Sequence, residues 1–537
     1  MGAEELRSFV RDALDMLDDE LRVQVEDALL RRAASGNSGW RPDAPSRAAV
    51  ERARSFAEAA RRVGGADPHD VDDHLRQGVK ASLAGDHAGA KEILGALLPP
   101  IADGEIDLGQ HELVDEVLSV DLHDCAARYL AAVYGTTPLE ARAAAVRDGL
   151  EAVHGLAYMS APIEAMERAI GGPLPQLDRF LSLWIERLAG EVEPVGDWES
   201  DRDRWLREAV TRAEGAAGLE RLARRTKRPE ALRAWCSAVV AEGDWPRALR
   251  AYEDSARLMS SPLWRGDFLD GVALAAHVLG HRDSTRRLAQ AWTGSPSLLR
   301  LLRYLVAGEP APAALRRRAA AALKAGPEKS PRLEGFLHLI SGDVASGAAL
   351  LASAPGLGWS GDDHPGGLLF PAFAWLLGRA QRGSACEEIA AVLRHPLTSD
   401  FESALQFDMD AAQSETMKAG LPTPSVVEVV RRSSVANELS PKDRAVILAA
   451  LKRATTTRVR GVLQKKRRRH YDHAAMLVAC CVELEAGSDK AARTSAWTED
   501  LRERTSRYPA FQAALRRALA RETTFEAPDG SLDHETG

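Results

Sequence analysis

The sequence predicts an all-α fold, arranged as a degenerate solenoid of helical hairpins. Ala, Leu and Arg fill most windows of the 537-residue chain, and these residues lose little side-chain entropy in a helix. Apolar residues recur at three- and four-residue spacings, whereas period-two runs rich in β-branched residues are nearly absent. Short turns containing glycine or proline separate the helical stretches. We therefore expect helices joined by tight turns and very little sheet.

The N-terminal region predicts two amphipathic helices. The first covers residues 4–32 and ends at a loop rich in Gly, Ser and Asn. The second covers residues 46–63 and ends at a Gly-Gly pair. Asp67 then serves as the N-cap of a further helix, with Pro68 at its first position. From there on we expect helix, short turn, helix, with turns at Gly85-Asp86, Thr136-Thr137-Pro138, Gly171-Gly172-Pro173, Gly243-Asp244, Gly308-Glu309-Pro310 and Gly342-Asp343.

Residues 228–262 form the clearest repeat unit. Gly243 marks the turn, Ala248 is a small residue that permits close helix approach, Tyr252 follows one turn later, and Pro262 closes the unit. The stretch resembles a tetratricopeptide-type repeat, although Ser255 stands where that family usually has its second small residue. Looser matches begin at Gly85, Gly280 and Gly342, at irregular intervals. The resemblance implies stacked antiparallel hairpins that present a long surface to a peptide or protein.

Composition shifts divide the chain into six regions. In chain order they are N-terminal helices (1–66), a helical region with one hairpin (67–176), a helical repeat core (177–380), a helical region (381–464), a basic helical cap (465–524) and a disordered tail (525–537). Residues 470–521 also resemble the helical tails of bacterial proteins that carry SWIM-type zinc modules. The zinc motif itself is absent, so no metal follows from this resemblance.

Charge is distributed unevenly along the chain. The total is −8, from 70 Lys and Arg against 78 Asp and Glu. Residues 1–120 hold 14 basic and 24 acidic residues, whereas residues 431–521 hold 21 basic and 9 acidic residues. The acidic end is a candidate docking face for a basic partner or for the basic end of another copy, so self-association is one expectation.

The basic maximum is a run of six residues, which attracts phosphate backbones through counterion release. Its members are Lys465, Lys466, Arg467, Arg468, Arg469 and His470. Nucleic-acid association through this run is an alternative function, although no aromatic binding motif accompanies it. A solvated helix surface is the simpler interpretation.

The loop at residues 355–367 has five glycines and two prolines and cannot continue a helix. Such a loop in a helical array is a candidate recognition site. Its partner-binding candidates are Trp359, Asp362, Asp363 and His364. A second alternative function is an enzyme whose site lies near this loop, although no P-loop or other catalytic motif is present.

Two His and Asp clusters are weaker candidates for chemistry. Asp70 and His74 share a helical face, as do His111 and Asp115, but neither pair has further ligands at a readable spacing. Acidic residues in a first helical turn are explained by the helix dipole. Cys125, with a histidine nearby, is better interpreted as core packing. We expect no metal, no cofactor and no catalytic residue.

The sequence thus favours a non-catalytic cytoplasmic scaffold or adaptor that binds a protein partner on a helical-repeat surface. The N-terminus lacks a basic and apolar leader, and no stretch of about 18 apolar residues occurs. The five cysteines include no CxxC pair, which argues against a disulfide framework. We expect no membrane association.

Overall fold

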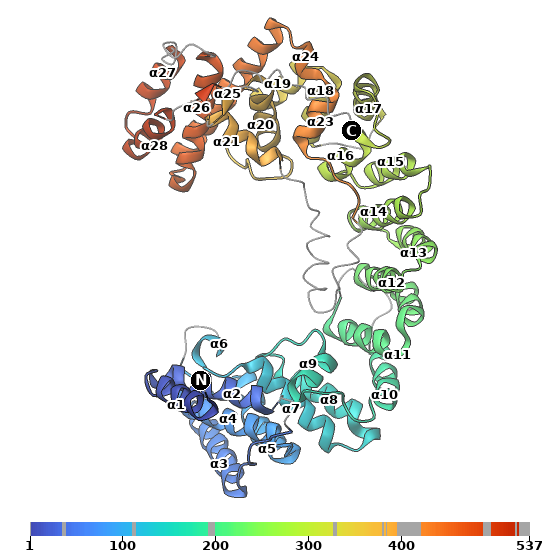
Figure 1. The fold of residues 1–537 in the computed structure, drawn as a ribbon, viewed down its shortest axis with the longest axis vertical. Helices are drawn as coiled ribbons and strands as arrows, with labels where there is room; N and C mark the ends of the chain where they lie inside the picture. The colour runs from blue at the N-terminus through green and yellow to red at the C-terminus, as the bar shows by residue number, and fades with distance from the viewer. Residues whose placement is uncertain are drawn as a thin grey trace. The chain divides into compact units, whose positions relative to one another are not determined.

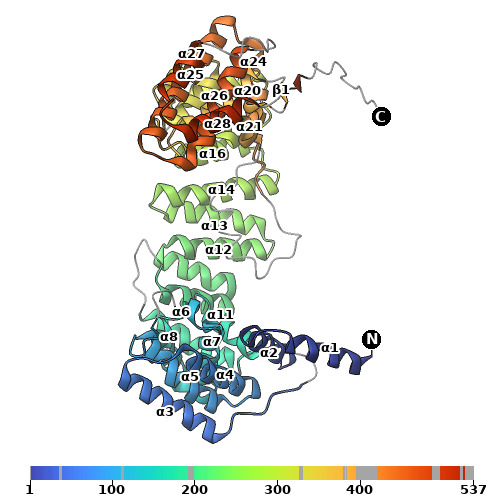
Figure 2. The same ribbon diagram turned by 90° about the vertical axis from the view of Figure 1, so that its left-hand side faces the viewer.

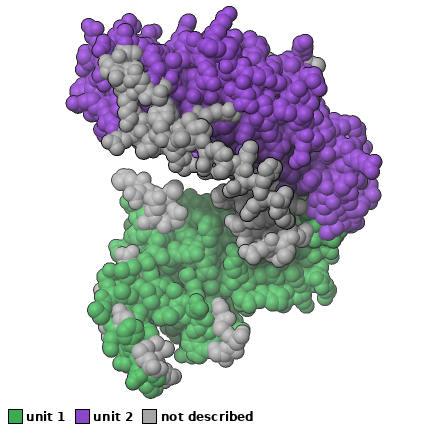
Figure 3. Space-filling view, turned by 45° about the horizontal axis from the view of Figure 1, so that its top comes forward, with its two compact units in different colours: residues 1–242 green, residues 243–537 purple. Residues whose placement is uncertain are grey.

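The computed structural model is all-helical apart from one short strand pair (Figures 1 and 2). It describes residues 2–34, 39–109, 114–191, 199–325, 330–378, 381–382, 384–394, 420–486, 496–520 and 524–525. The chain separates into two compact units, residues 1–242 and residues 243–537, which are coloured in Figure 3. The boundary falls at the turn inside the predicted repeat unit of residues 228–262. None of the described helices is long and apolar enough to cross a membrane.

Unit 1 consists of helices that follow one another with short connections. They are α1 (Ala3–Asp15), α2 (Asp19–Ala34), α3 (Arg47–Val63), α4 (Pro68–Ala84), α5 (His87–Ala102), α6 (Val114–Val117), α7 (Leu122–Thr136), α8 (Leu139–Val153), α9 (Pro162–Ile170), α10 (Leu177–Ala189), α11 (Asp201–Thr226) and α12 (Pro229–Ala241). Helices adjacent in the chain pack together, notably α4 with α5, α7 with α8, and α11 with α12.

Unit 2 begins with further hairpins and ends in a larger helical cluster. Its elements are α13 (Trp245–Leu258), α14 (Pro262–Val278), α15 (Ser284–Gly294), α16 (Leu298–Val306), α17 (Pro312–Ala325), α18 (Pro331–Ser341), α19 (Val344–Ala352), α20 (Gly366–Leu377), β1 (Gln381–Arg382), α21 (Ala385–Ala391), η1 (Val392–Arg394), α23 (Val426–Ser433), α24 (Val435–Glu438), α25 (Pro441–Gln464), η3 (Arg468–His470), α26 (Tyr471–Ala486), α27 (Ala496–Arg504), α28 (Pro509–Leu519) and β2 (Thr524–Phe525). Strands β1 and β2 pair antiparallel. Apart from the last residue of β2, the predicted tail at residues 525–537 lies outside the described residues.

Three Gly-Asp pairs form the predicted turns between helices. Gly85, Gly243 and Gly342 each adopt a left-handed backbone conformation, with φ of 84°, 74° and 96°, which glycine reaches without a steric penalty. The aspartate that follows each glycine caps the next helix, since its side chain accepts a backbone N–H three residues further on. The turn prediction is confirmed at these three positions.

The predicted single helix over residues 4–32 was wrong, because two helices occupy this stretch. Residues 16–18 separate α1 from α2. Asp18 accepts the backbone N–H of Leu21 at 2.8 Å, so it caps the start of the second helix. Amphipathic spacing continued across the break, and the capping residue was the signal that the pattern contained two helices.

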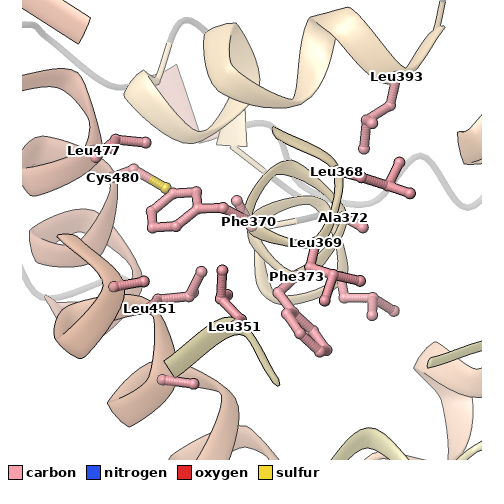
Figure 4. Packing of buried hydrophobic residues seen from close by; sticks show 14 of the residues in the cluster. Leu351, Leu368, Leu369, Phe370, Ala372, Phe373, Leu393, Leu451, Leu477 and Cys480 are labelled. Atoms are coloured by element: carbon pink, nitrogen blue, oxygen red, sulfur yellow. The ribbon is translucent and has the colours of Figure 1, made fainter. Parts of the chain in front are cut away.

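The core of unit 2 centres on α20, whose sequence GGLLFPAFAWLL is apolar throughout. A helix that is apolar on all sides must be covered on all sides. Helices α18, α19, α21, α25 and α26 supply that cover. In Figure 4, Phe370 points from α20 toward Leu477 and Cys480 of α26, while Leu351 and Leu451 approach from α19 and α25. This packing fixes α20, α21, α25 and α26 relative to one another.

An internal ion-pair network joins α14, α15 and α16 in the same unit. The Arg300 side chain donates to Asp267 at 2.9 Å, to Asp270 at 2.7 Å and to the Ser295 hydroxyl at 2.7 Å. Gly266 leaves room for this guanidinium, because a Cβ there would lie 2.5 Å from it. Gly266 and Asp267 therefore belong to the interior contacts of the fold.

Candidate functional site

A pocket in the described part of unit 2 brings together the two segments that the sequence singled out separately. Its volume is about 870 Å³, within the range of small-molecule sites. Loop 355–367, α20, α21, η1, α25, η3, α26 and α28 contribute to it. Its main lining residues are Trp359, Ser360, Pro371, Glu388, Ile389, Val392, Arg458, Arg467, Arg469, His470, Asp472, His473, Met476, Leu477 and Arg517.

Glycine permits the close approach of loop 355–367 to helix α25. A Cβ on Gly356 would lie 2.3 Å from the carbonyl oxygen of Thr457 and 3.4 Å from Cα of Gly461. Real Cβ atoms do not approach so closely, so only glycine fits here without displacing the backbone. The glycine-rich composition thus reflects packing against α25 as well as the inability to form helix.

Trp359 and His364 hold the loop in shape from within. Both are buried, at 8% exposure, and their rings lie 5.6 Å apart. The His364 imidazole accepts the N–H of Gly366 at Nδ1 (3.0 Å) and contacts the Pro355 carbonyl through Nε2 (2.9 Å). This pattern requires the proton on Nε2, since a carbonyl oxygen accepts. Burial lowers the pKa of His364, so the ring is neutral at pH 7.

Arg458 of α25 is the most unusual side chain in the pocket. It is only 5% exposed, and its Nη1 donates to the Gly356 carbonyl at 3.1 Å. Its guanidinium lies 5.6 Å from the centre of the Trp359 ring. Its Nε is buried without a hydrogen-bond partner. Burial, followed by repulsion from Arg467, lowers the pKa of Arg458, so the environment disfavours this positive charge.

The basic run at residues 465–470 forms the turn between α25 and α26. Arg467, Arg469 and His470 line the pocket, whereas Lys465, Lys466 and Arg468 do not. All five Lys and Arg residues of the run are exposed. Within the described ranges, none of the five Lys and Arg residues in this run pairs with a carboxylate. Arg469 instead donates to Nε2 of His470 at 3.2 Å. The run therefore adds uncompensated positive charge beside Arg458.

Four further lining residues were not recognised from the sequence as site residues. His473 keeps part of its surface open to the pocket, but surrounding protein atoms, Arg458 and His470 lower its pKa to about 4. Asp472 accepts from Arg517 of α28 at 2.7 Å, and Glu388 comes from α21. These residues lie far apart in the chain, and only the packing of α21, α25, α26 and α28 brings them together.

The predicted loop cluster is divided by the structure. Trp359 lines the pocket and His364 lies behind it, whereas Asp362 and Asp363 are exposed. Asp362 lies 3.4 Å from Arg332, with its own side chain fully in solvent. An ion pair of this kind contributes little to stability. The two carboxylates therefore lie outside the site that Trp359 helps to form.

The weaker sequence candidates have structural explanations. His74 packs its ring 4.6 Å from that of Phe56. Asp72, beside it, is buried and accepts the backbone N–H groups of Ser119 and Val120. Cys125 is fully buried, as predicted, and burial raises the pKa of its thiol well above the usual range. His111 and Glu112 lie outside the described residues. Among the described residues, no group of three or more His, Cys, Asp or Glu is placed to hold a metal ion.

Comparison of the chain with protein-family models and with curated proteins found no match.

Proposed function

We propose that unit 2 binds a small phosphate-bearing ligand in the pocket lined by Arg458, Arg467 and Arg469. The observation that carries the proposal is the buried Arg458 side chain, which lines this pocket and pairs with no carboxylate among the described residues. A buried charge is costly unless an opposite charge and hydrogen bonds compensate for it. A bound anion would supply both.

The surrounding charges favour a phosphate over a single carboxylate. Four arginines and two histidines line the pocket, against the two carboxylates of Glu388 and Asp472. Asp472 already accepts from Arg517. Arginine binds phosphate with two parallel N–H···O bonds, and several arginines together match the multiple oxygens and charge of a phosphate group. The pocket volume suits one metabolite-sized molecule.

Isothermal titration calorimetry of the full chain with pyrophosphate tests this proposal. We expect the double variant Arg467→Gln/Arg469→Gln to lose affinity by about tenfold or more, because two charge-assisted contacts are removed. The matched control is Arg502→Gln/Arg504→Gln, which removes the same charge from α27, outside the pocket. Absence of binding to the wild-type chain, or equal losses in both double variants, would contradict the proposal.

Nucleic-acid association stays a separate hypothesis, which we can distinguish by the residues of the basic run that do not line the pocket. A strand that extends beyond the pocket would contact Lys465, Lys466 and Arg468, whereas a small ligand would not reach them. The triple variant of these residues to Gln should therefore leave pyrophosphate binding unchanged. A large loss of single-stranded oligonucleotide binding in that variant, with steep salt dependence, would favour nucleic acid as the ligand. The enzyme hypothesis also stays a prediction, with this pocket as its proposed location.

We also propose that the chain is a scaffold that binds a protein partner, and that its hairpins are tetratricopeptide-like repeats. Recurrent Gly-Asp turns support the repeat proposal, as does Tyr252, which packs where Gly271 of α14 leaves space.

The partner proposal is supported by an apolar stripe on α2. Leu21, Val25 and Leu29 follow one another at four-residue spacing and are 48%, 38% and 45% exposed. Such a stripe is typical of a helix face that is covered by a partner.

Quantitative affinity capture from the native host tests the partner proposal. We expect a specific protein to be enriched with the wild-type chain and lost with Leu21→Ser/Val25→Ser, because the apolar contact area is removed. The control Val278→Ser changes an exposed valine of unit 2 and should retain the partner. Recovery of no protein whose capture depends on Leu21 and Val25 would contradict this second function.

A further inference from the structure

Apolar side chains form part of the lining of the same pocket, and we call them its apolar wall. Val392 of η1 exposes 59% of its surface, and Pro371 and Ile389 line the same pocket. Met476 and Leu477 of α26 add to the apolar lining. Apolar surface of this kind is stabilised when an apolar group replaces the water against it. The pocket is therefore suited to a ligand with an apolar body as well as a phosphate group.

Polar groups lie among the residues of this apolar wall, and they limit which kinds of apolar group in a ligand can bind there. The Ser360 hydroxyl and the His473 imidazole line the pocket among the apolar residues. A hydrocarbon chain would desolvate these groups without offering them hydrogen bonds, which is unfavourable. A nucleoside has a flat base with low polarity on its faces, together with hydroxyl and ring-edge groups that donate and accept. It matches both features of the wall.

We infer that the ligand is a nucleotide, with its phosphate among Arg458, Arg467 and Arg469 and its nucleoside along Pro371, Ile389 and Val392. This inference rests on the proposed phosphate binding and specifies the ligand class. The cationic and apolar linings belong to one pocket, so a single molecule contacts both.

Calorimetric titration of the full chain with four classes of probe tests the inference. The probes are pyrophosphate, the ribonucleoside 5′-monophosphates and 5′-diphosphates, the unphosphorylated nucleosides, and octyl phosphate. We expect at least one nucleotide to bind about tenfold or more tightly than both pyrophosphate and octyl phosphate. Val392→Trp fills the space beside the wall, so it should weaken nucleotide binding about tenfold and leave pyrophosphate binding unchanged. Val278→Trp, at an exposed valine of α14 outside the pocket, should change neither.

The outcomes distinguish the nucleotide inference from the proposed phosphate binding on which it rests. Pyrophosphate binding that equals or exceeds nucleotide binding would overturn the nucleotide inference and leave phosphate binding standing. Binding of octyl phosphate more tightly than any nucleotide would also overturn the nucleotide inference and leave phosphate binding standing. It would indicate that the apolar part of the ligand is a hydrocarbon chain. Nucleotide affinity unaffected by Val392→Trp would also overturn it. Failure of every phosphate compound to bind would instead overturn the proposed function.

Discussion

Arg458 is the residue on which the functional proposal depends. Its positive charge is nearly enclosed by protein, and its protein contacts are the Gly356 carbonyl and the face of Trp359. Neither contact neutralises the charge, although each stabilises the guanidinium modestly. A buried charge that has no opposite charge in the free protein and gains one from a ligand is typical of functional sites. At such sites the protein is less stable than it could be, because the residue serves binding.

Arg458→Met should therefore separate binding from stability. Methionine keeps most of the apolar volume and removes the uncompensated charge, so we expect the free energy of unfolding to stay the same or to rise by about 1 kcal/mol. Pyrophosphate binding should weaken by about tenfold or more. Urea denaturation and calorimetry on the same sample measure the two effects. A loss of stability of about 3 kcal/mol or more would indicate a structural role for Arg458 instead.

At the scale of elements, the site depends on how closely loop 355–367 lies against α25. The sequence indicated that these residues form a loop, and the structure confirms it for residues 355–365, because glycine and proline act locally. The last two predicted loop residues, Gly366 and Gly367, instead begin helix α20. The sequence also isolated the basic run, which forms the turn between α25 and α26. It did not indicate that the two segments meet, since that contact follows from the packing around α20. His473, Glu388 and Arg517 went unrecognised for the same reason.

Gly356→Ala should disturb this contact. The added Cβ would lie 2.3 Å from the Thr457 carbonyl oxygen, so the loop must move away from α25. The Arg458 bond to the Gly356 carbonyl is then weakened. We expect the free energy of unfolding to fall by about 1–3 kcal/mol, as for other overpacked sites, and pyrophosphate binding to weaken. Thermal and urea unfolding measure the first effect, and calorimetry the second.

Gly420→Ala is the matched control for that change. A Cβ at Gly420 meets no atom of the described residues within 4 Å, and its backbone is not left-handed. Its effect on unfolding should stay within about 0.5 kcal/mol. Equal effects of the two substitutions would show that close packing of Gly356 on α25 does not support the site.

At the scale of the whole molecule, composition was sufficient to predict an all-helical chain. The boundary between units was not predicted, because residues 228–262 read as one continuous hairpin and the division falls at its Gly243-Asp244 turn. The sequence showed that the basic excess lies near the C-terminal end of the chain. It did not indicate that part of this positive charge lines a pocket. In unit 2 part of the excess positive charge near residues 465–470 lines a pocket beside the buried Arg458, where several like charges together attract an anion.

A crystal structure of the full chain grown with pyrophosphate is the decisive test of phosphate binding at Arg458. We expect pyrophosphate in the pocket between loop 355–367 and α25, with one of its oxygens within about 3.2 Å of a guanidinium nitrogen of Arg458 that borders the pocket. We also expect contacts from Arg467 and Arg469. An empty pocket at saturating pyrophosphate, or an anion held only by the exposed Lys465, Lys466 and Arg468, would contradict the proposed site.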